Sequence, residues 1–329
     1  MSLENKKVLV TGGAGFIGSN IIEYLLNKNN KVTCLDNFMT GKKENVENFL
    51  SNPNFKMIDG DITNLQDCLK ACKDIDVILH QAALGSVPRS IENPLKTNDI
   101  NINGFINILW AAKQENISRV VYAASSSTYG DSKKLPKIED EIGSPLSPYA
   151  VTKYVNELYA GVFSNLYGLE LIGLRYFNVF GRKQDPDGAY AAAIPKFIKA
   201  FINHQEPVIH GDGSQSRDFT YIDNVIQANE LAATTKNPDA LNQVYNVACG
   251  DQSFLKELIE NLRDLLSNFD SEIKNIEIKN GPERIGDVKH SLASIEKAQK
   301  LLNYQPTHNL KQGLNSAIDW YWDYFSNKS

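Results

Sequence analysis

The chain has 329 residues, of which 42% are hydrophobic and 22% are charged, so it can bury the core of one large domain or two ordinary ones. Its formal net charge of −5, with no basic run to compensate, argues against nucleic acid as a partner. The scattered cysteines and histidines suggest no metal site. No apolar run is long enough for a bilayer, and the short polar start leaves no room for a signal peptide, so we expect no membrane partner and a cytoplasmic location.

The first half of the chain alternates short β-branched runs with segments of helical periodicity. The predicted strands are 7–10, 31–35, 55–58, 76–80, 119–124 and 170–175, and the predicted helices are 16–29, 94–115 and 148–167. Strands joined by helices of this length form right-handed βαβ units. The pattern therefore predicts an α/β fold with a Rossmann-type, doubly wound parallel sheet.

The second half is less regular, because loop-forming residues at 185–188 and 211–214 interrupt it. We predict helices at 192–203, 223–235, 253–267, 294–301 and 310–325, and a strand at 244–247. The expected organisation is a Rossmann domain over residues 1–177, with a return of the chain near 206–247. A smaller mixed α/β C-terminal domain would occupy residues 178–329.

A glycine-rich turn follows the first predicted strand and opens the first helix, with the spacing Gly12-x-x-Gly15-x-x-Gly18. Glycines permit a tight turn and a close approach of backbone to a pyrophosphate. The helix N-terminus behind the turn presents unpaired N–H groups and a positive dipole to the phosphates. The turn therefore predicts a dinucleotide site.

Acidic residues end two strands at the same edge of the predicted sheet. Asp36 lies where a carboxylate accepts hydrogen bonds from both ribose hydroxyls of NAD and repels a 2′-phosphate. Lys42 and Lys43 follow it, so NADP is disfavoured rather than excluded. Asp61 would contact the adenine or cap the following helix.

A tyrosine and a lysine are spaced to share one face of a predicted helix, and a serine run precedes them. Tyr149 and Lys153 are one helical turn apart, and the run that starts at Ser125 comes directly off a strand. Lowering a tyrosine pKa from about 10 to about 7 takes roughly 4 kcal/mol. A neighbouring ammonium and a cationic nicotinamide ring supply a field of that sign.

These motifs together resemble the extended short-chain dehydrogenase/reductases and, within them, the UDP-galactose and UDP-N-acetylglucosamine 4-epimerases. The segments that carry the resemblance span nearly the whole chain in family order: 11–18, 80–83, 125–130, 147–153, 175–181, 217–222 and 284–287. The resemblance implies a tightly held NAD that is not consumed, and a UDP-sugar substrate bound by the C-terminal domain.

The resemblance also assigns roles to residues of this chain. Tyr149 would be the acid/base, Lys153 would tune it and hold the nicotinamide ribose, and Ser125 would orient the sugar 4-oxygen. The implied cofactor-binding residues are Gly12, Gly15, Phe16, Ile17, Gly18, Asp36, Asn37, Asp61, Ile62, Gln81, Ala82, Ala83, Asn101, Tyr149, Lys153 and Tyr176. The implied substrate-binding residues are Ser86, Ser126, Ser127, Asn178, Ala192, Arg217, Arg284 and Ser291, with the two arginines clamping the nucleotide phosphates.

The serines after Ser125 favour one reaction among those of the family. The 4,6-dehydratases and nucleotide-sugar decarboxylases that this chain resembles carry an acid there, whereas Ser126 and Ser127 cannot act as a carboxyl acid/base. We therefore expect a 4-epimerase, in which a transient 4-keto sugar rotates and is reduced on its other face.

The sugar is predicted from one position. Where the epimerases that this chain resembles have a wall of the sugar pocket, it has Ser291, and a small residue there admits an N-acetyl group. The segment 85–90 also resembles N-acetylhexosamine 4-epimerases, so we expect UDP-GlcNAc and UDP-GalNAc. A UDP-N-acetyl-hexuronic acid, whose carboxylate could meet Arg89 or Lys289, and UDP-glucose/UDP-galactose stay open.

Two further readings of the chain concern its class and assembly. A catalytically silent NAD-binding regulatory protein is the alternative of a different class, although Ser125, Tyr149 and Lys153 are all intact. The aromatic run at 320–325 indicates core packing before it indicates an interaction module. The helices 94–115 and 148–167 resemble a pair that forms a dimer interface in the family, so we expect a homodimer.

Overall fold

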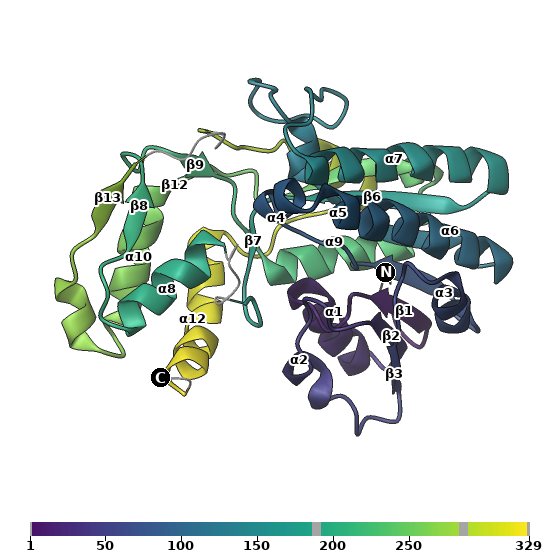
Figure 1. Cartoon of the computed structure of the whole chain (residues 1–329), viewed down its shortest axis with the longest axis horizontal. Helices are drawn as coiled ribbons and strands as arrows, with labels where there is room; N and C mark the ends of the chain where they lie inside the picture. The colour runs from purple at the N-terminus through teal and green to yellow at the C-terminus, as the bar shows by residue number, and fades with distance from the viewer. Residues whose placement is uncertain (1, 186–191, 283–288, 328–329) are drawn as a thin grey trace.

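Seven parallel strands form the central sheet of the computed structural model, which describes residues 2–185, 192–282 and 289–327 (Figure 1). The strands are β1 (Lys7–Thr11), β2 (Lys31–Asp36), β3 (Phe55–Asp59), β4 (Val77–His80), β5 (Arg119–Ser125), β6 (Glu170–Tyr176) and β11 (Gln243–Val247). Their order in the sheet is β11-β6-β5-β4-β1-β2-β3. The predicted doubly wound parallel sheet is confirmed, and the strand order reverses between β1 and β4.

Helices cover both faces of the sheet, because successive side chains of each strand point to opposite faces. Val8 and Val10 pack into one core and Leu9 into the other. The first core contains residues of α1 (Phe16–Asn27) and α9 (Ile222–Thr234). The second contains residues of α3 (Leu65–Cys72), α6 (Gly104–Gln114) and α7 (Pro148–Tyr167).

The long helix expected over residues 94–115 is present in three joined parts. These are α5 (Pro94–Asn98), a π-helical turn (Asp99–Asn103) and α6. The shorter helices α2 (Glu44–Glu47) and α4 (Val87–Glu92) were not predicted, because such short segments cannot show a helical periodicity. Three 3₁₀ turns cover Ser126–Tyr129, Pro238–Ala240 and Ser271–Asn275.

The remaining elements, apart from α11, form a smaller mixed lobe that lies beside the sheet, at the left of Figure 1. Its helices are α8 (Ala193–Ile202), α10 (Leu255–Leu266) and α12 (Leu310–Ser326), whereas α11 (Glu296–Leu302) contacts β11 and α9 of the sheet domain. Its short strands pair as β7 (Val179–Phe180) with β10 (Thr220–Tyr221), β8 (Val208–His210) with β13 (Lys279–Gly281), and β9 (Ser216–Arg217) with β12 (Ser253–Phe254). Among the described residues, no helix has both the length and the apolar character to cross a membrane.

One predicted helix starts later than expected. Residues 253 and 254 were assigned to the helix 253–267, but they form β12 and pair antiparallel with Arg217 and Ser216. A two-residue pairing with a distant strand leaves no periodic signal in the sequence. The chain re-enters the central sheet at β11, and the domain boundary between residues 177 and 178 stays a prediction.

Candidate active site

The predicted site residues gather at the carboxyl ends of the parallel strands, where open α/β sheets bind ligands. Thr11 ends β1, Asp36 ends β2, His80 ends β4, Ser125 ends β5 and Tyr176 ends β6. Two cavities lie beyond this edge. The first is lined from β1, β2 and the segments after β3 and β4, and the second begins just after β6. In strand order, Ser125 therefore lies between the two cavities.

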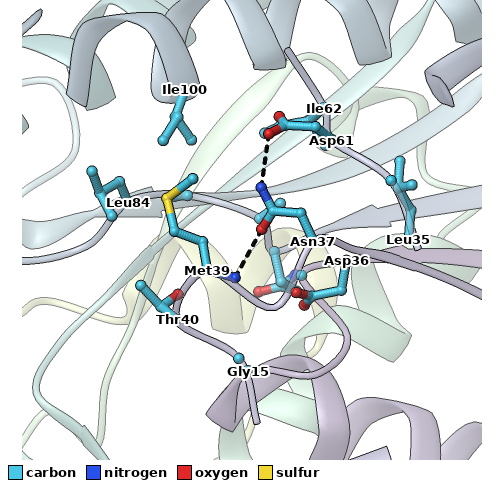
Figure 2. Close-up of a pocket in the computed structure, with 16 residues that line it drawn as sticks. Gly15, Leu35, Asp36, Asn37, Met39, Thr40, Asp61, Ile62, Leu84 and Ile100 are labelled. Carbon is cyan, nitrogen blue, oxygen red and sulfur yellow. Dashed lines mark hydrogen bonds between the residues drawn. The ribbon is translucent and has the colours of Figure 1, made fainter. Parts of the chain in front are cut away.

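The first cavity has a volume of about 100 Å³ and contains most of the predicted cofactor residues (Figure 2). The predicted residues that line it are Gly12, Gly15, Asp36, Asn37, Asp61, Ile62, Gln81, Ala82 and Ala83. Sequence reasoning missed Leu35, Met39, Thr40, Gly41, Gly60, Leu84 and Ile100, which also line it. Leu35, Gly60, Leu84 and Ile100 directly adjoin predicted positions, so adjacency was the available signal for these four.

The glycine-rich turn brings backbone to the floor of this cavity. Gly12 has φ +68°, and a Cβ there would lie 2.7 Å from the backbone of Ala82. A Cβ on Gly18 would lie 2.2 Å from the Gly12 carbonyl oxygen, so the turn and α1 can pack closely only with glycine. Gly15 precedes α1, and no side chain caps that helix, which leaves its first N–H groups for an anion. Phe16 and Ile17 form the first turn of α1 behind Gly15.

Asp36 is buried beside the turn, and both of its carboxylate oxygens accept backbone hydrogen bonds. Oδ2 accepts from the Ala14 N–H at 2.9 Å and Oδ1 from the Phe38 N–H at 2.8 Å. Burial raises the pKa of Asp36, and these two hydrogen bonds oppose that rise. Each oxygen keeps a second lone pair, so the carboxylate can still accept from ribose hydroxyls.

A hydrogen bond joins the two acid-bearing segments across the first cavity. Asn37 Nδ2 donates to Asp61 Oδ2 at 2.8 Å, as Figure 2 shows. Asp61 Oδ1 accepts from the N–H and the hydroxyl of Thr63. The close backbone approach at Gly12, the uncapped helix and the buried carboxylate fit the pyrophosphate and the adenosine ribose of NAD.

Ser125, Tyr149 and Lys153 are brought together by β5 and α7. The Ser147 hydroxyl accepts from the Ala150 N–H and Pro148 occupies the first turn, so α7 begins where the sequence predicted. The Ser125 side chain lies close enough to Tyr149 to oppose the rise of its pKa. Ser125 Oγ also accepts from the N–H and the hydroxyl of Ser127, at 3.1 Å and 2.8 Å.

The surroundings of Tyr149 differ from the expected ones, because in the protein alone they raise its pKa instead of lowering it. Burial raises the pKa of Tyr149, and the Ser125 side chain only partly opposes the rise. Lys153 Nζ donates to the Ala123 carbonyl at 2.8 Å, and burial lowers the pKa of its ammonium to about 8. The protein alone therefore keeps Tyr149 protonated, and the fall in its pKa that the predicted role requires depends on the Lys153 ammonium together with the positive charge of a bound cofactor.

Hydrogen bonds to neighbouring residues hold three other predicted cofactor residues in place: Gln81, Asn101 and Tyr176. Gln81 accepts from the Tyr176 hydroxyl at 3.0 Å and donates to Asn229 Oδ1 at 3.1 Å. Asn229, on α9, in turn donates to the Tyr176 hydroxyl at 2.9 Å and was not foreseen. Asn101 is buried in the π-helical turn, and its side chain holds both backbone polar groups of Leu84.

The second cavity, of about 510 Å³, lies in the smaller lobe and contains three predicted substrate residues, Asn178, Ala192 and Arg217. Arg217 donates to the carbonyls of Ser216 and Lys289. The lining residues that sequence reasoning missed are Val179, Phe180, Ala193, Ile194, Lys196, Phe197, Ala200, Gln205, Glu206, Pro207, Val208, His210, Phe219 and Leu255. They come from β7, α8, the segment 205–210 that ends in β8, Phe219 and the first residue of α10, and the convergence of these separate segments leaves no local pattern.

The other predicted substrate residues lie outside the described lining of the second cavity. Ser126 and Ser127 form the 3₁₀ turn after Ser125, and Ser86 caps α4 with φ +102°. Ser291 lies beside β9, where its N–H donates to the Ser216 carbonyl at 3.1 Å. Arg284 is outside the described residues.

Asp218 is a buried carboxylate beside this cavity that sequence reasoning did not single out. It accepts from the N–H groups of Cys249, Gly250 and Ala293, and burial raises its pKa to about 7. Its carbonyl accepts from Asn178 Nδ2 at 3.0 Å. The Asp218 side chain thus holds the turn at Cys249 and the segment at Ala293 together, next to Arg217. Because these segments are distant in the chain, the link is seen only in the folded structure.

Known proteins share this architecture along their whole length. A UDP-N-acetylglucosamine 4-epimerase from Methanobrevibacter ruminantium M1, solved with UDP-N-acetylmuramic acid, is 40% identical with a TM-score of 0.91, over 98% of this chain and 100% of that one. The UDP-glucose 4-epimerase of Thermotoga maritima, solved with UDP-glucose, is 31% identical with a TM-score of 0.88, over 97% and 99%. A UDP-glucuronate 4-epimerase from Thermodesulfobacterium geofontis is 35% identical over 95% of each chain.

A family model matches residues 8–248, a span that contains the glycine-rich turn, the trio and Arg217. Together with these full-length relatives, the match settles membership: the chain belongs to the NAD dependent epimerase/dehydratase family.

Proposed function

We propose that this NAD-dependent UDP-sugar 4-epimerase interconverts UDP-GlcNAc and UDP-GalNAc. The observation that carries the sugar assignment is the small side chain of Ser291, held through its N–H on Ser216, next to the cavity residue Arg217. A small residue there leaves room for an acetamido group. The relative from M. ruminantium, named for UDP-N-acetylglucosamine, supports the same choice.

The proposed chemistry divides between the trio and the cofactor. The first cavity, lined by Gly12, Gly15 and Asp36, would hold NAD, which would supply the acceptor and the donor for the hydride of sugar C4. Tyr149 takes the proton of the 4-hydroxyl as the C4–O bond becomes a carbonyl, and gives a proton back when the alcohol re-forms. Ser125, whose side chain lies beside Tyr149, orients the 4-oxygen between the two hydroxyls. Lys153 contributes an ammonium whose positive field favours the phenolate.

Elimination of water or carbon dioxide would need a further acid at the sugar. The residues after Ser125 offer hydroxyls only, and Ser127 is engaged with Ser125 through both its N–H and its side chain. The keto sugar therefore meets no carboxyl acid from this turn. The proposed cycle keeps every atom of the sugar and inverts one centre.

The nucleotide part of the substrate is assigned to the second cavity. Its apolar walls, from Phe197 and Phe219 among others, suit a uracil ring, and the lining cation Arg217 suits a phosphate. Asn178 lines this cavity and lies two residues after the end of β6, the strand next to β5 and Ser125.

The decisive test compares sugars without added NAD. Purified protein is incubated separately with UDP-GlcNAc, UDP-glucose and UDP-GlcNAcA, and products are resolved by proton NMR. Formation of UDP-GalNAc at the highest rate, abolished in Tyr149→Phe, supports the proposal. Turnover of UDP-glucose alone would refute the assignment made from Ser291. Preference for the uronic sugar would favour the hexuronic-acid reading, and no turnover of any sugar would favour the silent NAD-binding protein.

A variant pair isolates the role of size at residue 291. Ser291→Tyr should lose most activity on UDP-GlcNAc and keep activity on UDP-glucose, because an added ring fills the space of the acetamido group. Ser291→Ala is the matched control and should keep both activities, since it stays small. Equal turnover of UDP-GlcNAc by the tyrosine variant would show that Ser291 does not face the sugar.

We also propose that the protein is a homodimer built on α7. Val151, Leu158, Val162 and Leu166 form an apolar stripe along this helix and are 46%, 53%, 49% and 69% exposed. Leu95 of α5, at 83%, extends the stripe. An exposed stripe of this kind on a soluble domain needs a partner, and a second copy presents the same surface to it.

The dimer is tested by light scattering coupled to size exclusion. The wild-type protein should have twice the mass of the chain, and Leu158→Glu/Val162→Glu should have the mass of one. Leu50→Glu is the matched control, because Leu50 is similarly exposed at 59% but lies beyond α2. A wild-type monomer would refute the proposal.

A further inference from the structure

The outer wall of the first cavity is a loop between β2 and α2, residues 37–43, referred to below as the β2–α2 loop. Asn37, Met39, Thr40 and Gly41 of this loop line the cavity. Figure 2 shows Met39 extending from the loop toward Leu84 on the opposite wall. A dinucleotide in this cavity would lie against this loop, so we expect the rate of cofactor release to depend on what holds the loop in place.

The C-terminal end of the β2–α2 loop is hydrogen-bonded to the glycine-rich turn. The Lys42 N–H donates to the Ala14 carbonyl at 3.0 Å, and Asn45 Nδ2 donates to the same oxygen at 2.9 Å. A Cβ on Gly41 would lie 2.8 Å from Ala14 Cβ, so the two segments are in close contact. All of these contacts join residues within the first 45 of the chain.

The side chain of Lys42 reaches beyond this part of the chain. Its Nζ donates to Asp185 Oδ1 at 2.8 Å and to the Tyr324 hydroxyl at 3.2 Å. Burial lowers the pKa of Lys42, but the bonds to Asp185 and Tyr324 outweigh it and raise the pKa above its ordinary value, so the charge is retained. Tyr324 belongs to α12 and is stacked on Trp320, with ring centroids 4.8 Å apart.

The segment that carries Asp185 is itself held in place. Lys183 pairs with Glu23 of α1 at 2.8 Å, and Asn20 Nδ2 donates to the Arg182 carbonyl at 2.9 Å. Gln184 donates to the Val179 carbonyl at 2.9 Å, and Val179 lines the second cavity. Lys42 therefore connects the wall of the cofactor cavity to a fixed part of the substrate side.

We infer that Lys42, Asp185 and Tyr324 form a latch that holds the β2–α2 loop closed over bound NAD and sets the rate at which the cofactor leaves. Lys42 is a positioning residue in this latch and does not contact the reacting atoms. Such a latch benefits an enzyme that regenerates its cofactor at each turnover, because every loss of the cofactor interrupts catalysis. Breaking the latch raises the population of the open loop and so accelerates release.

The test measures NAD release without any sugar nucleotide, so it is independent of the substrate assignment. Purified holoprotein is mixed with an excess of a dehydrogenase and its alcohol, which reduce NAD as soon as it is free, and the fluorescence of NADH is followed. Lys42→Met, Asp185→Asn and Tyr324→Phe should each release NAD about two- to fivefold faster, the range expected for a partly exposed charged contact. Lys42→Met/Asp185→Asn should release it no faster than the faster single variant, because both remove one contact.

Lys28→Met is the matched control. Lys28 also pairs with a carboxylate, Glu4 at 3.5 Å, and also lies 5.8 Å from a tyrosine ring, that of Tyr24, but it is remote from the cavity. It should release NAD at the wild-type rate. Wild-type release by Lys42→Met, an equal effect of Lys28→Met, or effects that add in the double variant would each overturn the latch.

Discussion

At the scale of single residues, the site is governed by what burial does to two ionisable groups. Burial raises the pKa of Tyr149 and lowers the pKa of Lys153 to about 8, so it shifts both groups toward their neutral forms, although Lys153 still carries its proton below about pH 8. Neutral Tyr149 is a poor base, and neutral Lys153 supplies no field. The proposed roles of Tyr149 and Lys153 therefore require Lys153 to stay charged in the working range of pH.

The first prediction concerns pH. The Lys153 ammonium exists below its pKa, so its effect on Tyr149 is present below about pH 8 and is lost as the pH rises through that value. We expect kcat/KM to fall above about pH 8 in a profile measured with UDP-GlcNAc. A plateau that continues toward pH 10, near the pKa of about 10.4 of an ordinary lysine, would contradict this prediction.

The second prediction concerns Tyr149. Removing its hydroxyl in Tyr149→Phe should lower kcat by about 10²- to 10⁴-fold, the usual contribution of a positioned acid/base. The NAD content of the purified variant, measured after denaturation, should equal that of the wild-type protein. A variant with near-normal turnover would remove Tyr149 from the role of acid/base.

At the scale of elements, short strands and loops of the smaller lobe are held together by a single buried group. Asp218 lies between β9 and β10 and accepts N–H groups from the turn at 249–250 and from Ala293. Its neighbours on both sides, Arg217 and Phe219, line the second cavity. The position of the segment 289–293, which contains Ser291, thus depends on this carboxylate.

The third prediction follows from that arrangement. In Asp218→Asn the amide cannot accept from every N–H that the carboxylate holds, which should lower the free energy of unfolding by about 1–3 kcal/mol. KM for the UDP-sugar should rise more than kcat falls, because the nucleotide wall moves and the trio does not. Asp212→Asn, at an exposed position that accepts only from Ser214, is the control for thermal unfolding and kinetics. Unchanged KM in a folded Asp218→Asn variant would contradict the prediction.

At the scale of the whole molecule, the second cavity exists only when elements far apart in the chain are assembled. Its walls come from β7, α8, β8 and β9, and α10 begins at its edge with Leu255. The unfolded chain has no such cavity, so a ligand of this cavity binds the native state alone.

The fourth prediction is that UDP, without any sugar, stabilises the protein. At a concentration of about 100 times its Kd, it should add about 2.7 kcal/mol to the free energy of unfolding, and the midpoint of thermal unfolding should rise with UDP concentration. Arg217→Gln should weaken this rise by lowering the affinity. Stabilisation by uridine equal to that by UDP would show that the phosphates make no contribution.

The sequence by itself predicted the elements and motifs that depend on neighbours in the chain. The strand–turn–helix around Gly12, the start of α7 at Pro148 and the placement of Asp36 at a strand end follow from local periodicity and spacing. The carboxyl-edge rule then brought Ser125 and Asp36 to one side of the sheet without any knowledge of distant contacts. Short strands such as β12 escaped prediction, because two residues carry no period.

Only the tertiary structure decided the contacts between distant segments. The bonds of Lys42 to Asp185 and Tyr324, the three N–H groups held by Asp218, and the link of Asn229 to Tyr176 each join residues whose separation in the chain follows no repeat. The protonation of Tyr149 and Lys153 was also decided there, because it depends on burial by the whole fold. The sequence specified which groups are candidates for the reaction, and the packing of the whole chain determined their charges and what surrounds them.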